Sequence, residues 1–554
     1  MVFNKNKFLE YDSINYNFLL KKNTKFEVHT TDTMQLKINN RFSSELPADT
    51  NESNNTRQVL NACFSYVTPR IPSNPKLIHT SIEVAALIGI CELETQSKTF
   101  LEIFSGKKIL SNSRPYAMNY AGHQFGNWAG QLGDGRAIVL TEIEIKEAFY
   151  TLQLKGAGST PYSRRADGLA VLRSSIREHL CSEAMHYLGV PTTRSLSLIL
   201  TGDEVLRDVM YDGNPDYEKG AIVCRVAPTF IRFGSFELFS ASNDRINLKK
   251  LTDFTIKYYY PEITSNGKEK YLDFFKIVVH KTCEMVVNWQ RVGFVHGVMN
   301  TDNMSILGIT IDYGPYGWLE DYNPNWTPNT TDKENRRYQF GNQPEVAQWN
   351  LYQLANALYP LIEEATQLET ILNDFQTQYD TYYLDMMRSK LGFKLDYKED
   401  KKLISDLEKI LQLSETDMTI FFRQLGLVKK DHSPEFAISI INNSFYKPQE
   451  IKKEVLNTWH RWFKEYIERL NLENSTDESR NEYMNTINPK YVLRNYMAQL
   501  AIEAANKDDY SLIDELFELL KKPYHEQPQH EKWYAKRPDW ARDKIGSSML
   551  SCSS

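Results

Sequence analysis

The stretch HGVMNTDNMSILGITIDYGP, residues 296–315, places an Asn and an Asp nine residues apart, with a short apolar run between them. Mg²⁺ prefers hard oxygen ligands and usually takes only one or two of them from the protein. Asn303 and Asp312 meet that demand. Taken singly, however, Asn303 fits an Asx turn and Asp312 fits a helix cap equally well. The rest of the chain has to decide between these interpretations.

The same stretch follows the order of motifs in protein kinases. Those enzymes carry a His seven residues before their metal-binding Asn and then an Asp-Phe-Gly segment. Here His296 precedes Asn303 by seven residues, and Asp312 opens the segment Asp-Tyr-Gly. The position two after the His, where a kinase has its catalytic base, is Val298. The pattern therefore predicts a kinase-like metal site without the usual base.

Three further features precede this stretch in kinase order. Gly133 and Gly135 can let the backbone approach phosphates, with Arg136 as a fixed positive charge, although a plain hairpin turn explains them on their own. Lys155 ends an expected strand, and Glu178 follows on an expected helix, as in the pair that holds the α- and β-phosphates in kinases. Each feature alone has an ordinary structural explanation. Five matches in order are hard to obtain by chance.

Two arginines and a loop add weaker signals. Arg225 and Arg232 lie seven residues apart around Pro228 and can neutralise phosphate oxygens bidentately, or equally be surface residues on neighbouring strands. The segment SRRADG at 163–168 indicates only a loop with an Asp-Gly turn.

Composition limits the class of protein. At 554 residues the chain is too long for one core, and 41% hydrophobic with 25% charged residues is typical of a globular protein. The 65 basic and 71 acidic residues give a net charge of −6, so nothing favours nucleic acid or an anionic membrane as a partner. The sequence contains no apolar run long enough to span a membrane.

The lack of a recognisable targeting signal and the spacing of the cysteines predict an intracellular, cytoplasmic protein. The N-terminus has no continuous apolar stretch followed by a cleavage site, and its acidic residues and lack of Arg argue against an organellar transit peptide. The six cysteines form no CxxC pair, which fits reduced thiols and not a disulfide framework or a zinc site.

Hydrophobic periodicity predicts an α+β protein with a helical region at its C-terminal end. Strands are expected at 136–145 and 149–156 and in the segments RSLSLILTG and GAIVCRVAP, because apolar and polar residues roughly alternate. An amphipathic helix is expected from Leu169 to Gly189. Long helices are expected at 270–293 and 344–364, with further helices to about 525.

These patterns suggest four parts. The first is a polar, Asn-rich N-terminal extension at 1–55, which is strand-like around MQLKIN. It is followed by a strand-rich part at 56–240, a helical part with the metal motifs at 241–364, and a helical C-terminal region at 365–554.

Several long stretches are specific enough to compare with a known family. They are YAGHQFGNWAGQLGDGRA, LQLKGAGSTPYSRRADGLAVLRSSIREHL, GFVHGVMNTDNMSILGITIDYGPYGWLEDYNPNW, RYQFGNQPEVAQWNL and the terminal SCSS. On these segments the chain resembles the selenoprotein O family (SelO/YdiU) over nearly its whole length except the Asn-rich start.

The resemblance implies a protein-kinase-like, two-lobe fold of the pseudokinase type, with ATP bound in a flipped orientation. It implies protein adenylylation, in which AMP passes from ATP to Ser, Thr or Tyr hydroxyls of protein substrates with release of pyrophosphate. The implied cofactor is Mg²⁺, with Mn²⁺ as the alternative. The residues matching the family's nucleotide contacts are Gly133, Gly135, Arg136, Lys155, Asp167, Gly168, Arg225, Arg232 and Asp312.

The resemblance also implies an answer to the missing base. Asn303 and Asp312 match the family's metal ligands, and Asp302 matches its proton acceptor. If the nucleotide is reversed, the α-phosphate and not the γ-phosphate faces the incoming hydroxyl. A base at Val298 would then be in the wrong place, and Asp302 can take the proton instead.

The C-terminal cysteine departs in part from the family pattern. Many members end with selenocysteine or cysteine, and Cys552 matches that position. In bacterial relatives this thiol can pair with a Cys in the loop after Asp-Tyr-Gly, but here that loop reads NPNWTPNTTD. A redox role for Cys552 would need another partner, such as Cys283, or none.

Three alternatives remain open from the sequence. They are an ordinary kinase with Asp302 as base, transfer of UMP with Mn²⁺, and a non-catalytic nucleotide-binding pseudokinase scaffold. Val298 argues against the kinase. Retention of Lys155, Glu178, Asn303 and Asp312 together argues against the scaffold, because folding alone needs none of them.

Overall fold

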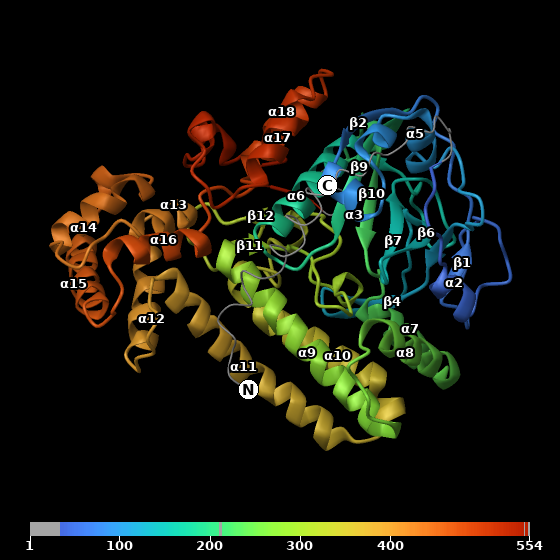
Figure 1. The fold of residues 1–554 in the computed structure, drawn as a ribbon, viewed down its shortest axis with the longest axis horizontal. Coiled ribbons are helices and arrows are strands. Elements are labelled where there is room, and N and C mark those ends of the chain that lie inside the picture. The colour runs from blue at the N-terminus through green and yellow to red at the C-terminus, as the bar shows by residue number, and fades with distance from the viewer. Residues whose placement is uncertain (1–33, 210–212, 548, 552–554) are drawn as a thin grey trace.

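The computed structural model describes residues 34–209, 213–547 and 549–551. Its centre is an antiparallel sheet of eight strands in the order β1-β3-β6-β7-β10-β9-β2, with β8 paired to β10 (Figure 1). The strands are β1 (Phe64–Tyr66), β2 (Lys76–Thr80), β3 (Tyr116–Met118), β6 (Ala137–Ile145), β7 (Ala148–Lys155), β8 (Ala170–Val171), β9 (Arg194–Arg207) and β10 (Asp216–Ala227). The four strands expected from alternating residues are confirmed as β6, β7, β9 and β10.

The alternation along β6, β7 and β10 sends side chains into two different cores. Val139 and Val223 belong to the core shared with the helices, whereas Ile138, Leu154 and Cys224 belong to the core on the other face of the sheet. That second core also includes residues of α3 (Ile82–Leu87) and α5 (Lys98–Phe104), between which lies α4 (Glu92–Thr95). Burial on both faces explains why the strands are so apolar.

Helix α6 (Leu172–Tyr187) packs on β9 and β10, and its chain reverses at Gly189, whose φ is +73°. The predicted helix is confirmed, but its predicted amphipathic character is wrong. Every residue from Leu172 to Met185 is buried, including charged ones, because α17 (Asn495–Ala505) and α18 (Ser511–Leu520) cover the face turned away from the sheet. The C-terminal end of the chain thus completes the surroundings of α6.

A helical layer follows the sheet along the chain (Figure 1). It consists of α7 (Phe233–Ala241), α8 (Arg245–Tyr259), α9 (Gly267–Val292), α10 (Gln343–Ile362) and α11 (Ala365–Lys390). Helix α9 ends where Gly293 adopts a left-handed conformation, as the sequence predicted. Between α9 and α10 lie the short strands β11 (Phe294–Val295) and β12 (Gly317–Trp318) and the 3₁₀ turn η1 (Thr301–Asn303).

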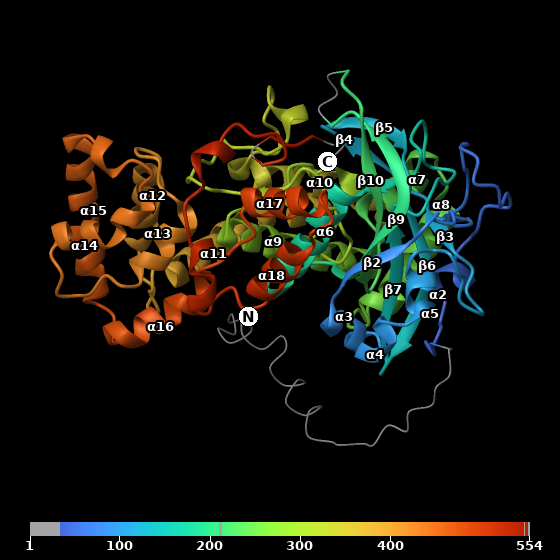
Figure 2. The same ribbon diagram turned by 90° about the horizontal axis from the view of Figure 1, so that it is seen from above.

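The remaining helices confirm the predicted helical C-terminal region, which divides in space (Figure 2). Helices α12 to α16 form one end of the molecule, whereas α17 and α18 return to α6. Their bounds are α12 (Asp400–Leu411), α13 (Met418–Leu425), α14 (Pro434–Ile441), α15 (Lys453–Leu470) and α16 (Asp477–Ile487). In the described part of the chain, no helix is both long enough and apolar enough to cross a membrane.

Part of the Asn-rich start is fixed to the sheet. Ile38, within the segment expected to be strand-like, forms an isolated bridge with Ile143 of β6. Helix α2 (Arg41–Glu45) follows, and its Phe42 stacks on Tyr116 with ring centroids 5.5 Å apart. Residues 1–33 lie outside the described residues.

Candidate functional site

The candidate site begins on the sheet face beneath α6, where polar side chains interrupt an otherwise apolar surface. Lys155 is the last residue of β7. Gln153 lies two residues earlier on the same face and pairs in register with Arg225 of β10. The Gln153 side-chain oxygen accepts a hydrogen bond from the Arg225 guanidinium. Glu178 reaches the same place from α6.

An unbroken chain of ion pairs connects these residues to the Asp-Tyr-Gly segment. Lys155 Nζ contacts one carboxylate oxygen of Glu178, and Arg225 Nη1 lies 3.2 Å from the other. The same Arg225 nitrogen contacts Asp312. Arg232, the residue before α7, completes the chain with Nη1 2.5 Å from Asp312 Oδ2. The structure thus brings Lys155, Glu178, Arg225, Arg232 and Asp312 into one buried cluster.

Asp312 is where this cluster meets solvent. Its side chain is 20% exposed, compared with 1 to 2% for the two arginines. Burial by itself would raise the pKa of Asp312, but Arg232, Arg225 and Lys155 outweigh it and hold the pKa well below its ordinary value. Asp312 also has a left-handed backbone with φ +58°, an unfavourable conformation that functional sites often retain. The carboxylate is therefore ionised and held in a fixed place.

Asp302 lies beside the cluster in the 3₁₀ turn η1. Arg232 Nη1 donates to the Asp302 main-chain oxygen at 2.7 Å, and Gln124 Nε2 donates to its carboxylate Oδ2 at 3.2 Å. The other carboxylate oxygen, Oδ1, is buried without a hydrogen-bond partner. Burial raises the pKa of Asp302 to about 7, against the opposing charge of Arg232. A carboxyl with one free oxygen and a pKa near neutrality has the properties of a proton acceptor.

Asn303 is oriented by the residue that replaces the kinase base. Its Nδ2 donates to the main-chain oxygen of Val298 at 2.9 Å, which leaves its amide oxygen free to act as a ligand. This oxygen and the Asp312 carboxylate are hard donors of the kind that Mg²⁺ prefers, so the residues fit a magnesium ion. Within the described residues, no group of three His, Cys, Asp or Glu side chains could hold a metal.

His296 is a structural residue in this structure. Its Nε2 hydrogen-bonds with the main-chain oxygen of Ile311 at 2.9 Å, and its main-chain N–H donates to Gln343 at 3.0 Å. Burial lowers the pKa of His296. The His therefore connects the two metal-motif segments and stays neutral.

The glycine positions lie against a neighbouring loop. A Cβ on Gly133 would lie 2.3 Å from the Tyr162 ring, and one on Gly135 would lie 2.9 Å from the Tyr162 main-chain oxygen. Gly168 packs equally closely on Gly158. These contacts join the loop at 133–136 to the loop at 158–168. Both loops need glycine for packing, whether or not a phosphate is bound.

Two predicted nucleotide contacts lie outside the ion-pair chain. Asp167 forms a bidentate pair with Arg207, with both distances 2.8 Å, and its side chain is 42% exposed. Arg136 has no side-chain hydrogen bond or ion pair among the described residues. Cys552 lies outside the described residues.

The sequence reasoning missed three residues that shape the site. Asp134 is buried, accepts from Gln153 Nε2 at 2.9 Å and lies 3.8 Å from Arg232 Nη2. Gln153 thus connects Asp134 to Arg225, and Gln124 contacts Asp302. Asp134 lies between the two noted glycines, and Gln153 lies two residues before Lys155, on the same face of an alternating strand. Those were signals available from the sequence.

The arrangement defines a class of protein, and comparisons with known proteins specify the family. A cationic cluster beside two hard oxygen donors and a buried carboxyl with one unpartnered oxygen is suited to nucleotidyl transfer. The family model described as "Protein adenylyltransferase SelO" matches residues 49–521. The chain therefore belongs to the SelO family, a family of nucleotide-transferring enzymes.

Curated relatives agree with this assignment. The chain is 66% identical over 519 residues to a protein nucleotidyltransferase YdiU of Flavobacterium johnsoniae, with 94% of this chain and 99% of the relative covered. It is 52% identical to a protein of the same name from Rhodopirellula baltica, covering 94% and 100%, and 50% identical to one from Aromatoleum aromaticum, covering 94% and 99%.

Proposed function

We propose that this chain transfers AMP from ATP to Ser, Thr or Tyr hydroxyls of protein substrates and releases pyrophosphate. The observation that carries the proposal is the cationic cluster of Lys155, Arg225 and Arg232 around Asp312. Arg225 Nε and Arg232 Nη2 are buried without hydrogen-bond partners, so the cluster has donors to spare for phosphate oxygens.

The proposed fold is protein-kinase-like, with two lobes and a helical annex. The strand-rich lobe would span 56–240, the metal-binding lobe 241–364 and the annex 365–554, after an extension at 1–55. A Lys at the end of a strand, paired with a Glu on the helix above it, supports this division. We place the protein in the cytoplasm, in keeping with its scattered reduced cysteines.

In the proposed complex ATP is flipped, so that its β- and γ-phosphates lie on the cationic cluster. Lys155, Arg225 and Arg232 would neutralise them. The loops carrying Gly133, Gly135, Asp167 and Gly168 would contact the same phosphates through their backbone N–H groups. The Asp167 carboxylate would repel the phosphates, so its side chain would not be the contacting group. Arg136, whose side chain has no described partner, would add charge. Asn303 and Asp312 would hold Mg²⁺, which supplies positive charge at the reacting phosphate.

The chemical step follows from the free oxygen of Asp302. The substrate hydroxyl oxygen forms a bond to the α-phosphorus, and its proton passes to Asp302 Oδ1. The bond from the α-phosphorus to the oxygen bridging to the β-phosphorus breaks, and pyrophosphate leaves. Gln124 Nε2 donates to Oδ2, and Oδ1, which has no hydrogen-bond partner, would receive the proton. The three cations stabilise the charge that develops on the leaving pyrophosphate.

The decisive experiment uses purified protein, Mg²⁺, a bystander protein and ATP labelled on either the α- or the γ-phosphate. We expect covalent label from the α position alone. Label from the γ position would make the protein an ordinary kinase, and bound ATP without label would make it a pseudokinase scaffold. Replacing ATP and Mg²⁺ with UTP and Mn²⁺ tests UMP transfer, and a preference for that pair would overturn the assignment of AMP.

A further inference from the structure

A second feature beside Asp302 is not used by the nucleotide. The hairpin of β4 (Ala121–Gln124) and β5 (Asn127–Gln131) lies along the 300–302 segment. The main-chain N–H of His123 donates to Thr301 Oγ1 at 2.7 Å, and the next residue, Gln124, donates to Asp302. A Cβ on Gly122 would lie 2.8 Å from Thr301 Oγ1, so this close approach requires glycine. The position of the hairpin is therefore coupled to that of the proton acceptor.

The tip of the hairpin is strained and held in place. Phe125 has φ +51° and Gly126 φ +83°, the geometry of a tight two-residue turn that a bulky aromatic residue rarely adopts. The Phe125 N–H donates to Asn300 Oδ1 at 3.1 Å and to the Tyr338 hydroxyl at 3.0 Å. A strained backbone that several hydrogen bonds hold in place beside a candidate active site indicates that the position of the Phe125 ring matters for function.

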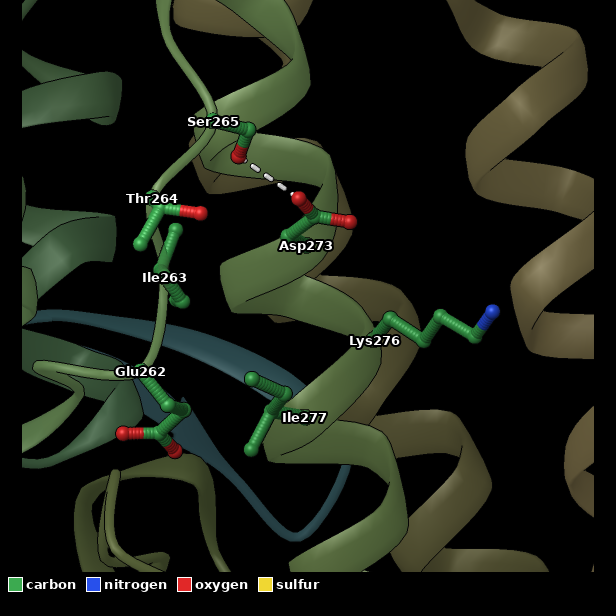
Figure 3. Close-up of a pocket in the computed structure, with 7 residues that line it drawn as sticks. All are labelled: Glu262, Ile263, Thr264, Ser265, Asp273, Lys276 and Ile277. Carbon is green, nitrogen blue, oxygen red and sulfur yellow. Dashed lines mark hydrogen bonds between the residues drawn. The ribbon is translucent and has the colours of Figure 1, made fainter. Parts of the chain in front are cut away.

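A hollow of about 370 Å³ opens beside that ring. Its lining includes Phe125, Asp332, Arg337, Glu345, Val346 and Trp349. It therefore combines two aromatic side chains, one cation and two carboxylates. A second hollow, of about 300 Å³, contains none of the site residues (Figure 3). There Asp273 accepts a hydrogen bond from Ser265 at 2.6 Å, and none of the described lining residues has a buried side-chain nitrogen or oxygen without a partner.

Arg337 has the unmet hydrogen-bonding capacity in the first hollow. Its guanidinium carbon lies 4.6 Å from the Trp349 ring centre, and a Cβ on Gly126 would lie 3.4 Å from it. Nε and Nη2 are buried without hydrogen-bond partners. No carboxylate of the described residues forms an ion pair with it; Asp332 instead accepts main-chain N–H groups of residues 337 and 338. Buried N–H groups without an acceptor reduce the free energy of unfolding, and a bound ligand that supplies an acceptor removes that cost.

An aromatic strip continues from this hollow along the hairpin. The rings of Trp349 and His123 lie 5.5 Å apart, and those of His123 and Trp128 lie 5.1 Å apart. Trp128 is 47% exposed. Trp and Arg are both enriched at surfaces that bind proteins.

We propose that the hollow and this strip bind an extended segment of the acceptor protein, with a main-chain carbonyl on Arg337 and the neighbouring hydroxyl directed to Asp302. The proposal rests on the proposed function and identifies where its protein substrate lies. A polyphosphate is disfavoured here, because Asp332 and Glu345 outnumber the single cation. The same two carboxylates disfavour an acidic side chain and favour a neutral carbonyl.

The test separates acceptor binding from nucleotide binding. β-Casein serves as the acceptor for kinetics, and a fluorescently labelled casein peptide reports its own binding by anisotropy without turnover. For Arg337→Met we expect the KM for casein and the Kd for the peptide to rise by about tenfold, the scale of one lost charge-assisted hydrogen bond. The KM for ATP and the acceptor-independent release of pyrophosphate should not change.

Arg336→Met is the matched control, because Arg336 is the exposed neighbour and its side chain has no described partner. Trp128→Ala is a second variant at an exposed position, for use if Arg337→Met does not fold. A raised KM for ATP with an unchanged peptide Kd would mean that the hollow holds the nucleobase and would overturn the proposal. Unchanged peptide binding in both variants would overturn it as well. A wild-type enzyme that binds the peptide but transfers no label would refute the proposed function instead.

Discussion

Among the buried arginine–carboxylate clusters of the described residues, two are built differently. In the first, Arg225 and Arg232 converge on Asp312. In the second, Arg494 contacts Asp417 with both terminal nitrogens, at 2.8 and 2.9 Å, and Glu320 at 2.6 Å. Both take charges out of water at a cost that only good geometry offsets. The buried polar atoms that lack a hydrogen-bond partner distinguish the roles of the two clusters.

The Arg494 cluster is closed to solvent, and its buried atom without a hydrogen-bond partner, Glu320 Oε1, is an acceptor that cannot bind an anion. Its three side chains are at most 3% exposed, and Asp417 also accepts the N–H of Ile420 at the start of α13. It joins the segment after β12 to α13 and α17. The Asp312 cluster opens to solvent and has two arginine nitrogens without hydrogen-bond partners. One cluster therefore holds helices together, whereas the other has capacity left for an anion.

We expect the largest effect from a substitution that breaks the open cluster around Asp312. Asp312→Ala should reduce transfer of the α-label by about 10⁴-fold, since it removes a proposed metal ligand and the group that orders two arginines. Asp312→Asn keeps the size of the side chain and serves as the comparison, with circular dichroism to verify folding. Unchanged activity in the Ala variant would refute the assignment of the site.

The second prediction breaks the closed cluster. Arg494→Met leaves Asp417 and Glu320 buried without their counter-charge, so the free energy of unfolding should fall by about 3 to 5 kcal/mol. Urea titration measures the change, and Arg461→Met on the exposed side of α15 is the control. The transfer rate per folded molecule should stay the same. A lost rate with normal stability would mean that the two clusters are not separate.

The third prediction sharpens the comparison by loosening the open cluster. Gln153→Leu removes the bridge between Asp134 and Arg225, so kcat/KM for ATP should fall by about 10- to 30-fold as Arg225 loses its fixed orientation. Thr151→Val, two residues earlier on β7, is the matched control for a buried polar group. An equal loss in both variants would point to general damage to the strand and not to Arg225.

The smallest effect is expected at the edge of the site. Asp167→Asn weakens a partly exposed pair with Arg207, which should change stability by less than about 1 kcal/mol. If its backbone and not its carboxylate contacts phosphate, kcat/KM for ATP should change by no more than about threefold. A much larger loss would show that the side chain itself contacts the nucleotide.

The sequence by itself determined the local elements and the order of the chemical groups. Alternating residues predicted β6, β7, β9 and β10, and Gly293 predicted the end of α9, because backbone conformation and burial follow short-range patterns. The spacing of Asn303 and Asp312 indicated a metal pair for the same reason: both lie on one short segment.

Only the tertiary structure decided which distant residues meet. The contact between Gln153 and Arg225 depends on the pairing of β7 with β10, and that between Gln124 and Asp302 on a hairpin 178 residues away in sequence. The second face of α6 is buried because α17 and α18 return from the C-terminal region. Periodicity specifies that a face is apolar or a side chain polar, but not its partner. The partner depends on the path of the whole chain. That path brings charged residues from distant segments together in the closed Arg494 cluster and the open Asp312 cluster.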